Sequence, residues 1–199
     1  MNLDQATRMI VADLQSLRAR FAVIGGLAVS VHTEPRTTRD VDLAIAVADD
    51  REAEALVRAL LSRGYQLVAQ LEQDNGRLST VRLRQPRTDD QGPIVDLLFA
   101  SSGIEPEIVA AAATLEILAR LCVPVATREH LLAMKVLAHD EKRRPQDRID
   151  IAALLKHTSA AEIERVRQHL QTITARGYAG KKDLLADFDA FVRLHGPTK

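Results

Sequence analysis

The sequence is poor in residues that mark several specialised classes of protein. It holds a single cysteine, Cys122, so an internal disulfide is excluded, and no second cysteine or histidine stands near it at the spacing of zinc ligands. We expect this thiol to be a buried core residue in a reducing compartment. Tryptophan is absent and aromatic residues make up 3% of the chain, so a ligand that stacks on aromatic rings would find few partners.

An excess of one charge and long apolar runs are also missing. Lys plus Arg and Asp plus Glu number 27 each, so bulk charge gives no sign of a nucleic-acid footprint, although a local basic patch is compatible with it. No run approaches the roughly 20 apolar residues of a membrane-spanning helix. Residues 1–4 lack the basic and apolar regions that begin a signal peptide. We therefore expect a cytoplasmic protein with no membrane partner.

Hydrophobic residues make up 46% of the chain, enough for one sizeable core or two small ones. Before residue 127, short apolar runs typical of buried strands intermix with helical periodicity, and after it only helical patterns follow. We predict an α/β fold with a mixed sheet flanked by helices over residues 1–126. An α-helical part over residues 127–199 should pack on it and complete its site. The expected strands are 21–24, 41–47, 65–70, 78–84 and 94–100, with 115–118 and 121–125 ambiguous; the expected helices are 3–20, 27–32, 51–63, 105–113, 128–139, 145–157, 160–174 and 181–195.

One strand-like run ends at Gly25-Gly26, and a short helix follows directly. Glycines at such a turn let the backbone approach a ligand closely, and the helix N-terminus offers free N–H groups to phosphate. Ser30 lies in the same turn-helix unit and adds a hydroxyl. A Gly-Gly pair alone is more typical of a tight turn than of a binding site.

Asp40 and Asp42 change that interpretation. Residues i and i+2 of a strand project from the same face, with Cα atoms roughly 6.6 Å apart, so the two carboxylates can converge on one cation. Side by side on an apolar strand they repel each other and resist burial, and a divalent cation removes both problems. Paired Mg²⁺ ions of this kind stabilise the attacking and leaving oxygens in phosphoryl transfer. The glycine turn upstream favours a metal site over the alternative, two solvent-facing acids on an edge strand.

Two more charged residues stand alone in apolar segments. Asp96 is the only charge in residues 94–100, where it would serve as a third metal ligand or as a base for an attacking hydroxyl; a lone Asp can also cap a neighbouring loop. Lys135 is the only charge in residues 131–138. A triphosphate or a site carboxylate would pair a buried ammonium there, and the alternative is a lysine that snorkels to the surface.

Basic residues lie near both segments. Arg36 and Arg39 flank Thr38 just before the Asp-x-Asp strand, where either arginine could meet nucleotide phosphate. The alternative is a solvated basic loop, and for Arg39 the two readings are evenly balanced. Residues 142–144 (Lys-Arg-Arg) with Arg148 form a second cluster that suits an RNA backbone, although a charge run between helices is more often a solvated turn.

Residues 21–47 (FAVIGGLAVSVHTEPRTTRDVDLAIAV) resemble the signature of the nucleotidyltransferase fold, which is Gly-Gly or Gly-Ser followed by Asp-x-Asp on the next strand. Residues 27–39, thirteen positions, separate Gly26 from Asp40. More narrowly, the sequence resembles the AbiEii/MenT-like family of nucleotidyltransferases from bacterial toxin–antitoxin and phage-defence systems, on Gly25 to Ser30, His32, Arg36, Thr38 and Asp40 to Leu43. Residues 127–150 (TREHLLAMKVLAHDEKRRPQDRID) resemble that family's lysine-bearing helix, basic turn and Asp-x-x-Asp helix.

The resemblance implies a nucleotidyltransferase-like sheet and an enzyme that moves an NMP from an NTP to an acceptor hydroxyl and releases pyrophosphate. It implies Mg²⁺ or Mn²⁺ on Asp40, Asp42 and Asp96, a nucleotide contact from Thr38, and a tRNA 3′ end, another RNA or a protein as acceptor. A toxin role further implies a cognate antitoxin. Asp147 and Asp150 share one inward helix face. The resemblance makes Asp147 catalytic and Asp150 its structural partner, although an acid in the first helical turn also suits the macrodipole.

Two other functions are compatible with the same motifs. Small-molecule nucleotidyltransferases of the antibiotic-resistance kind share the Gly-Gly and Asp-x-Asp elements, and a non-catalytic nucleotide-binding module could keep the fold without the chemistry. The basic turn at 142–148 and the Asp147/Asp150 helix favour the toxin-like enzyme over the first. The intact acids argue against the second.

Overall fold

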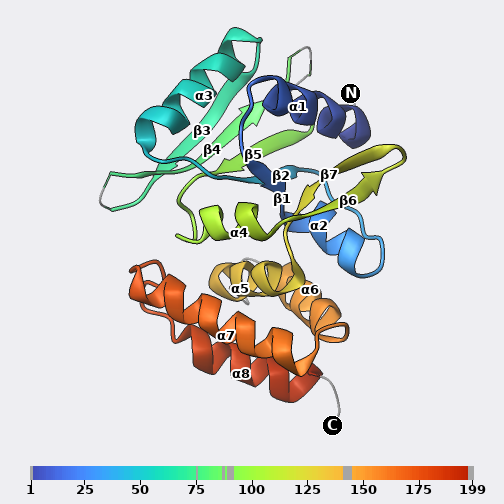
Figure 1. Cartoon of the computed structure of the whole chain (residues 1–199), viewed down its shortest axis with the longest axis vertical. Helices are drawn as coiled ribbons and strands as arrows, with labels where there is room; N and C mark the ends of the chain where they lie inside the picture. The colour runs from blue at the N-terminus through green and yellow to red at the C-terminus, as the bar shows by residue number, and fades with distance from the viewer. Residues whose placement is uncertain (1, 75, 87, 89–91, 141–144, 197–199) are drawn as a thin grey trace.

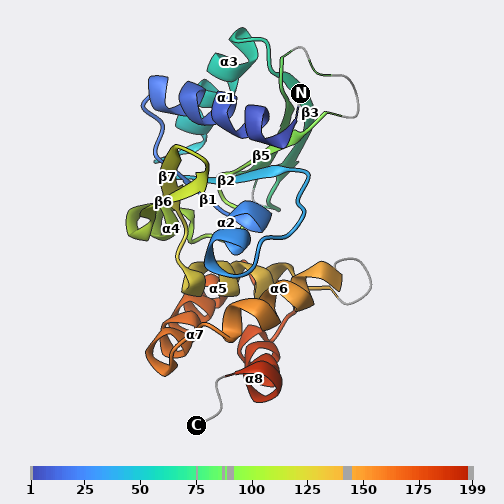
Figure 2. The same ribbon diagram turned by 90° about the vertical axis from the view of Figure 1, so that its right-hand side faces the viewer.

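The computed structural model describes residues 2–74, 76–86, 88, 92–140 and 145–196. Within them a mixed sheet lies between helices α1 and α3 on one face and α2 and α4 on the other, and a layer of helices α5 to α8 packs beneath the second face (Figures 1 and 2). The predicted α/β fold is therefore confirmed. No helix in this described part is long and apolar enough to cross a membrane.

The sheet has seven strands among the described residues, in the order β3-β4-β5-β2-β1-β7-β6. Short apolar strands occupy its centre, since residues buried on both faces need no polar alternation. β2 pairs parallel with β5 and antiparallel with β1, while β4 pairs antiparallel with β5. The strands are β1 (Phe21–Val23), β2 (Val41–Ile45), β3 (Gln66–Glu72), β4 (Leu78–Arg84), β5 (Ile94–Leu98), β6 (Ala113–Leu118) and β7 (Leu121–Val125).

The helices follow their capping signals. Asn2 and Gln5 form a capping box at the start of α1, Asp49 caps α3, and Ser159 and Glu162 form a second box at α7. Gly64 has φ of +93° directly after the C-cap of α3, a conformation that favours glycine at this position. The helices are α1 (Leu3–Ser16), α2 (Gly25–His32), α3 (Asp50–Ser62), α4 (Glu105–Ala111), α5 (Arg128–Ala138), α6 (Pro145–Leu155), α7 (Ala160–Ala175) and α8 (Leu184–His195).

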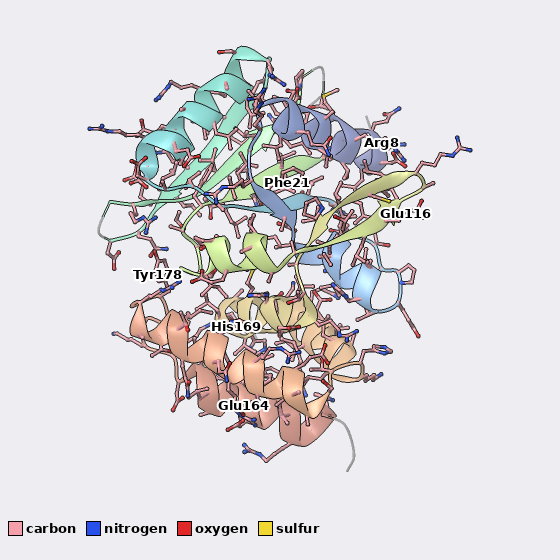
Figure 3. All side chains as sticks on the ribbon, viewed as in Figure 1. Arg8, Phe21, Glu116, Glu164, His169 and Tyr178 are labelled. Carbon is pink, nitrogen blue, oxygen red and sulfur yellow. The ribbon has the colours of Figure 1, made fainter. Side chains whose placement is uncertain are left out.

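The helical layer is joined to the sheet part by packing and by polar contacts. One buried hydrophobic cluster runs from the strands into α5 to α8 and includes Phe188 of α8. His169 of α7, labelled in Figure 3, lies in the helical layer. Its ring stacks on that of His130 of α5 with centroids 4.1 Å apart. Arg176 lies 2.6 Å from the carboxylate of Glu107 in α4. These contacts fix α5 and α6 against the sheet, while the division at residues 126 and 127 stays a prediction.

Several expectations about individual segments need correction. Cys122 is exposed, so its prediction as a core residue is wrong: β7 pairs with the edge strand β6, and the side chains on one face of that hairpin meet solvent, while Val123 and Val125 point inward. The two ambiguous segments form this hairpin. The short helix begins at Gly25 itself rather than after the glycine pair, and Asp40 precedes β2 rather than lying within it.

Candidate active site

A cleft of about 580 Å³ lies between the second face of the sheet and helices α5 and α6. Side chains from β2, β4 and β5 form its floor, because alternate residues of these strands face the same way. The glycine turn lies at the β1–α2 side, and Leu71 lies across the sheet on β3. Of the predicted site residues, the cleft brings together Gly25, Gly26, Thr38, Asp40, Asp42, Asp96, Lys135 and Asp147.

The two glycines are required by the packing of the site itself. Gly25 has φ of +60°, and a Cβ there would run into the carboxylate of Asp42. A Cβ on Gly26 would lie 2.6 Å from Oγ1 of Thr38 and 2.9 Å from Nη2 of Arg36. The N–H of Gly26 donates a hydrogen bond to Asp42. The start of α2 thus packs directly against the carboxylate of Asp42 and against the loop that follows the helix.

We expect Gly25→Ala to destabilise the fold and to displace Asp42. Alanine at positive φ costs roughly 1–2 kcal/mol, and a misplacement of about 1 Å in a catalytic group can lower the rate by about 10²-fold. Gly180→Ala is the matched control, because Gly180 has φ of +59° and nothing within 4 Å of its added Cβ. Denaturant unfolding should give a loss for both variants from the positive φ, and a larger loss for Gly25→Ala, whose Cβ also meets Asp42. Only Gly25→Ala should lose nucleotide transfer, and equal activity in the two variants would contradict the assignment.

Three carboxylates meet at the centre of the cleft floor. Asp42 of β2 lies directly beside Asp96 of β5 in the parallel ladder, and Asp40 lies one step before β2. The pKa of Asp42 is raised to about 6, mainly by burial and also by the charges of Asp96 and Asp40, against the opposing effects of Lys135 and of the Gly26 N–H. Ionised Asp42 is therefore held at a cost that a bound cation would remove.

This raised pKa predicts a pH-dependent stability. In the native state Asp42 binds its proton at about pH 6, against 3.8 in the unfolded chain, so ionised Asp42 destabilises the fold above pH 6 and this cost fades as the pH falls toward 4. Asp42→Asn lacks the charge. With a metal chelator present at pH 7.5, its free energy of unfolding, measured in urea, should exceed that of the wild type by about 1–3 kcal/mol. The difference should vanish near the unfolded-state pKa, and a difference that grows on acidification would contradict this prediction.

Asp96 is held by an arginine that the sequence did not single out. Arg82 of β4 donates from Nε to Oδ1 of Asp96 at 2.8 Å and from Nη2 to Oδ2 at 2.7 Å. Among the described residues, no three His, Cys, Asp or Glu side chains are arranged to hold a metal ion. The metal role predicted for Asp40, Asp42 and Asp96 therefore stays a prediction, and in this conformation both oxygens of the Asp96 carboxylate accept from Arg82.

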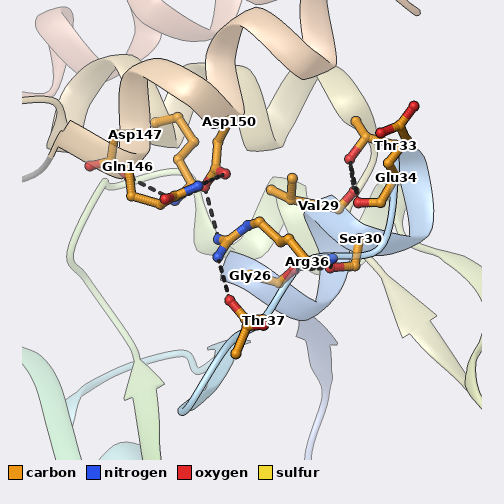
Figure 4. Close-up of polar contacts among 11 residues, drawn as sticks. Gly26, Val29, Ser30, Thr33, Glu34, Arg36, Thr37, Gln146, Asp147 and Asp150 are labelled. Atoms are coloured by element: carbon orange, nitrogen blue, oxygen red, sulfur yellow. Dashed lines mark hydrogen bonds and ion pairs between the residues drawn. The ribbon is translucent and has the colours of Figure 1, made fainter.

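Lys135 lies inside an ion-pair network rather than snorkelling to the surface. Its Nζ is 2.7 Å from Oδ1 of Asp147 and 2.8 Å from Oδ2 of Asp150, and both acids are buried. Asp150 also accepts from Nη2 of Arg36 at 2.9 Å and from Nε2 of Gln146 at 3.1 Å (Figure 4). The network joins the loop after α2 to α5 and α6, so the segment that contains Arg36 is connected through Asp150 to Lys135.

Two predicted nucleotide contacts lie elsewhere. The hydroxyl of Ser30 donates to the carbonyl oxygen of Gly26 at 3.0 Å and accepts from the N–H of Arg36 at 3.3 Å, so it serves the turn and does not line the cleft (Figure 4). Arg39 is exposed and is not among the cleft-lining residues. Arg148 is exposed on α6, and the basic turn at 142–144 lies outside the described residues.

The sequence does not reveal the contacts of Arg36 and Arg82. It names Arg36 as a residue that could meet nucleotide phosphate, and it does not single out Arg82. The sequence contains one indication of its position: Arg82 and Thr80 are two residues apart in β4 and therefore share one face of the sheet. Its partner depends on the β4–β5 register, in which Arg82 stands opposite Asp96.

Known proteins share this fold. A structure of an antigenic nucleotidyltransferase-like protein from Paracoccidioides brasiliensis is 24% identical, covers 95% of this chain and 93% of its own, and gives a TM-score of 0.55. The solution structure of the antibiotic-resistance factor ANT(2'')-Ia is 19% identical, covers 88% of this chain and 96% of its own, and gives a TM-score of 0.59. Likeness at these identities shows the fold alone. A search of the curated proteins found no match.

A family model gives the more specific result. The model of the nucleotidyl transferase AbiEii toxin, of type IV toxin–antitoxin systems, matches residues 9–194, which include every cleft residue named above. The match also spans both the sheet part and the helical layer, so it does not rest on the Gly-Gly and Asp-x-Asp motif alone. The chain therefore belongs to the AbiEii family and is a nucleotidyltransferase, an enzyme that uses a nucleoside triphosphate as substrate.

Proposed function

We propose that this enzyme transfers an NMP from a nucleoside triphosphate to the terminal hydroxyl of an RNA, as the toxin of a toxin–antitoxin pair. The observation that carries the reaction is the meeting of the Gly25-Gly26 turn, Asp42 and Lys135 around one cleft. The acceptor oxygen bonds to the α-phosphorus, the bond to the bridging oxygen breaks, and pyrophosphate leaves with that electron pair. The hydroxyl proton passes to a carboxylate of the site.

Asp40 and Asp42 are the proposed holders of Mg²⁺ or Mn²⁺. Mg²⁺ in phosphate-transferring enzymes is bound by one or two carboxylates together with the substrate phosphates, which fits a pair of acids beside an open cleft. The raised pKa of Asp42 supports the same assignment, because the charge that burial disfavours is one that a cation would stabilise. When bound, the metal would neutralise phosphate charge and stabilise the attacking and leaving oxygens.

The remaining roles belong to the chain itself. The first N–H groups of α2 and the hydroxyl of Thr38 suit phosphate oxygens at the glycine turn. The ammonium of Lys135 lies in the same cleft and would neutralise the triphosphate, with Asp147 as its partner. Such groups act by holding the reactants in line and by stabilising charge as it develops.

The proposed acceptor rests on the character of the cleft beyond Asp96. Leu71, Leu98 and Met134 line that side together with Ser101 and Ser102, and the described part of the lining holds no carboxylate from β3 or α4. A neutral and apolar surface suits a nucleobase, whereas a polycationic antibiotic would favour acidic side chains. Membership of a type IV toxin family supports an antitoxin as the protein partner.

An acceptor screen tests this proposal. The protein would be incubated with Mg²⁺, each of the four α-labelled NTPs, and either total RNA or a panel of aminoglycosides and lincosamides. Label in RNA is the expected result. Label in an antibiotic would replace the proposed acceptor by a small molecule, while an absence of both transfer and NTP binding by calorimetry would favour a non-catalytic module.

A further inference from the structure

Three charged side chains form a row across the cleft floor. In the β4–β5 ladder Arg82 stands directly opposite Asp96, and in the β5–β2 ladder Asp96 stands directly beside Asp42. All three line the cleft, so they share one face of the sheet. Arg82 lies at the β4 side of the row, away from the glycine turn and toward the apolar part of the cleft.

The contact between Arg82 and Asp96 is geometrically specific. Two parallel N–H donors, at 2.8 and 2.7 Å, fix both the position and the plane of the carboxylate. The hydrogen bonds to Asp96 raise the pKa of Arg82, and the charges of Asp40 and Asp42 add to this, so the arginine stays charged. An ionised carboxylate has about four lone-pair sites, so a carboxylate bound in this way keeps capacity for another hydrogen bond.

The pair joins an exposed arginine to a buried carboxylate. The Arg82 side chain is 45% exposed and the Asp96 side chain 10%, so the fork fixes a carboxylate at the cleft floor and not one in open solvent. Asp96 lies beside Asp42 in the parallel ladder. The fork therefore sets the orientation of the carboxylate that lies between Asp42 and the apolar part of the cleft.

From this geometry we infer that Arg82 is a positioning residue that holds Asp96 in place and aimed at the acceptor hydroxyl. Asp96 accepts the hydroxyl proton as the acceptor oxygen bonds to the α-phosphorus and pyrophosphate departs. Arg82 touches neither the nucleotide nor the reacting atoms and acts through Asp96. This inference rests on the proposed function and adds a residue that the Gly-Gly, Asp-x-Asp and lysine motifs do not contain.

A double-mutant cycle on Arg82→Gln and Asp96→Asn tests it, with a labelled NTP varied at fixed total RNA and saturating Mg²⁺. Arg82→Gln should lower the apparent kcat by about 10- to 100-fold, and the KM for the NTP should change by less than about threefold. In the Asp96→Asn background the same change should have no further effect, because the group through which it acts is already gone. Arg82→Lys keeps the charge without the fork and should recover part of kcat.

Two results would overturn the inference. A raised KM with unchanged kcat would make Arg82 a nucleotide contact, and additive losses in the double variant would show that it acts independently of Asp96. If Arg82→Gln does not fold, as judged by thermal unfolding, the cycle is run with Arg82→Lys, to which the same two results apply. Arg58→Gln removes an exposed arginine–carboxylate pair at 3.1 Å on α3 and should leave both constants unchanged. Full activity of Asp42→Asn would instead refute the proposed reaction itself.

Discussion

Replacement of Asp42 by asparagine should reduce kcat for nucleotide transfer by about 10³-fold or more, because it removes charge stabilisation that operates in the transition state. Asparagine keeps the shape of the side chain and an oxygen that accepts from the Gly26 N–H, so the turn should stay in place. It loses the negative charge that would bind the cation beside the phosphates. The measurement is incorporation of α-labelled NTP into total RNA with Mg²⁺, together with NTP affinity in the presence and absence of the metal.

Stability separates this loss from misfolding. Asp42→Asn should be at least as stable as the wild type at pH 7.5, since the pKa of Asp42 is raised by burial and by its acidic neighbours. Asp74→Asn, the same substitution at an exposed position, is the control and should keep full activity. A Asp42→Asn variant that retains more than about a tenth of the wild-type rate would show that the Asp-x-Asp pair does not perform the chemistry assigned to it.

The part of the site that was predictable is local in the sequence. Gly25-Gly26 and Asp42 lie within one strand–turn–helix–strand unit, so their spacing and the period of a strand are enough to place them together. The strands β2 and β5 were predictable from their apolar runs, and the C-terminal helices from their 3.6-residue pattern. Both patterns arise because apolar side chains are buried, and the order of apolar residues can be read from the sequence. Here pattern and structure agree.

The part that was not predictable depends on contacts between distant segments. Arg82 finds Asp96 only because β4 and β5 pair in one register, and a shift of one residue would turn Arg82 to the other face. The division of Lys135 between Asp147 and Asp150 depends on how α6 sits on α5. A pattern along the chain shows that a charge is buried but not which opposite charge it meets.

Two smaller errors have a similar origin. Cys122 has apolar neighbours in the sequence, but its strand lies beside the sheet edge, where one face is open to solvent. Ser30 lies close to a glycine turn, as a phosphate-binding serine would. Its hydroxyl instead bonds to the backbone, donating to the carbonyl oxygen of Gly26 and accepting from the N–H of Arg36. Hydroxyls in helices often bond to the carbonyl four residues earlier, so proximity to a glycine turn does not by itself make a serine a ligand contact.

Lys135→Met should weaken NTP binding by about 10- to 100-fold, because a charge-assisted contact to the triphosphate is lost. It should also lower the free energy of unfolding by about 3–5 kcal/mol, since it removes the ammonium that two buried carboxylates share. Asp150 still accepts from Arg36 at 2.9 Å and from Gln146 at 3.1 Å. Calorimetry with Mg²⁺ and an NTP, and urea unfolding, measure the two effects separately.

The double variant Lys135→Met/Asp147→Asn distinguishes a phosphate contact from a structural counter-charge. Asp147→Asn removes the carboxylate whose Oδ1 lies 2.7 Å from the ammonium, so the double variant should regain part of the lost stability. Its NTP affinity should stay as low as that of Lys135→Met, because the cation is still absent, whereas Asp147→Asn alone should bind NTP normally. Lys156→Met, the same substitution at an exposed lysine just beyond α6, should change neither quantity. Recovery of NTP affinity together with stability would mean that Lys135 only balances Asp147, and that the triphosphate is held by the glycine turn and the metal without it.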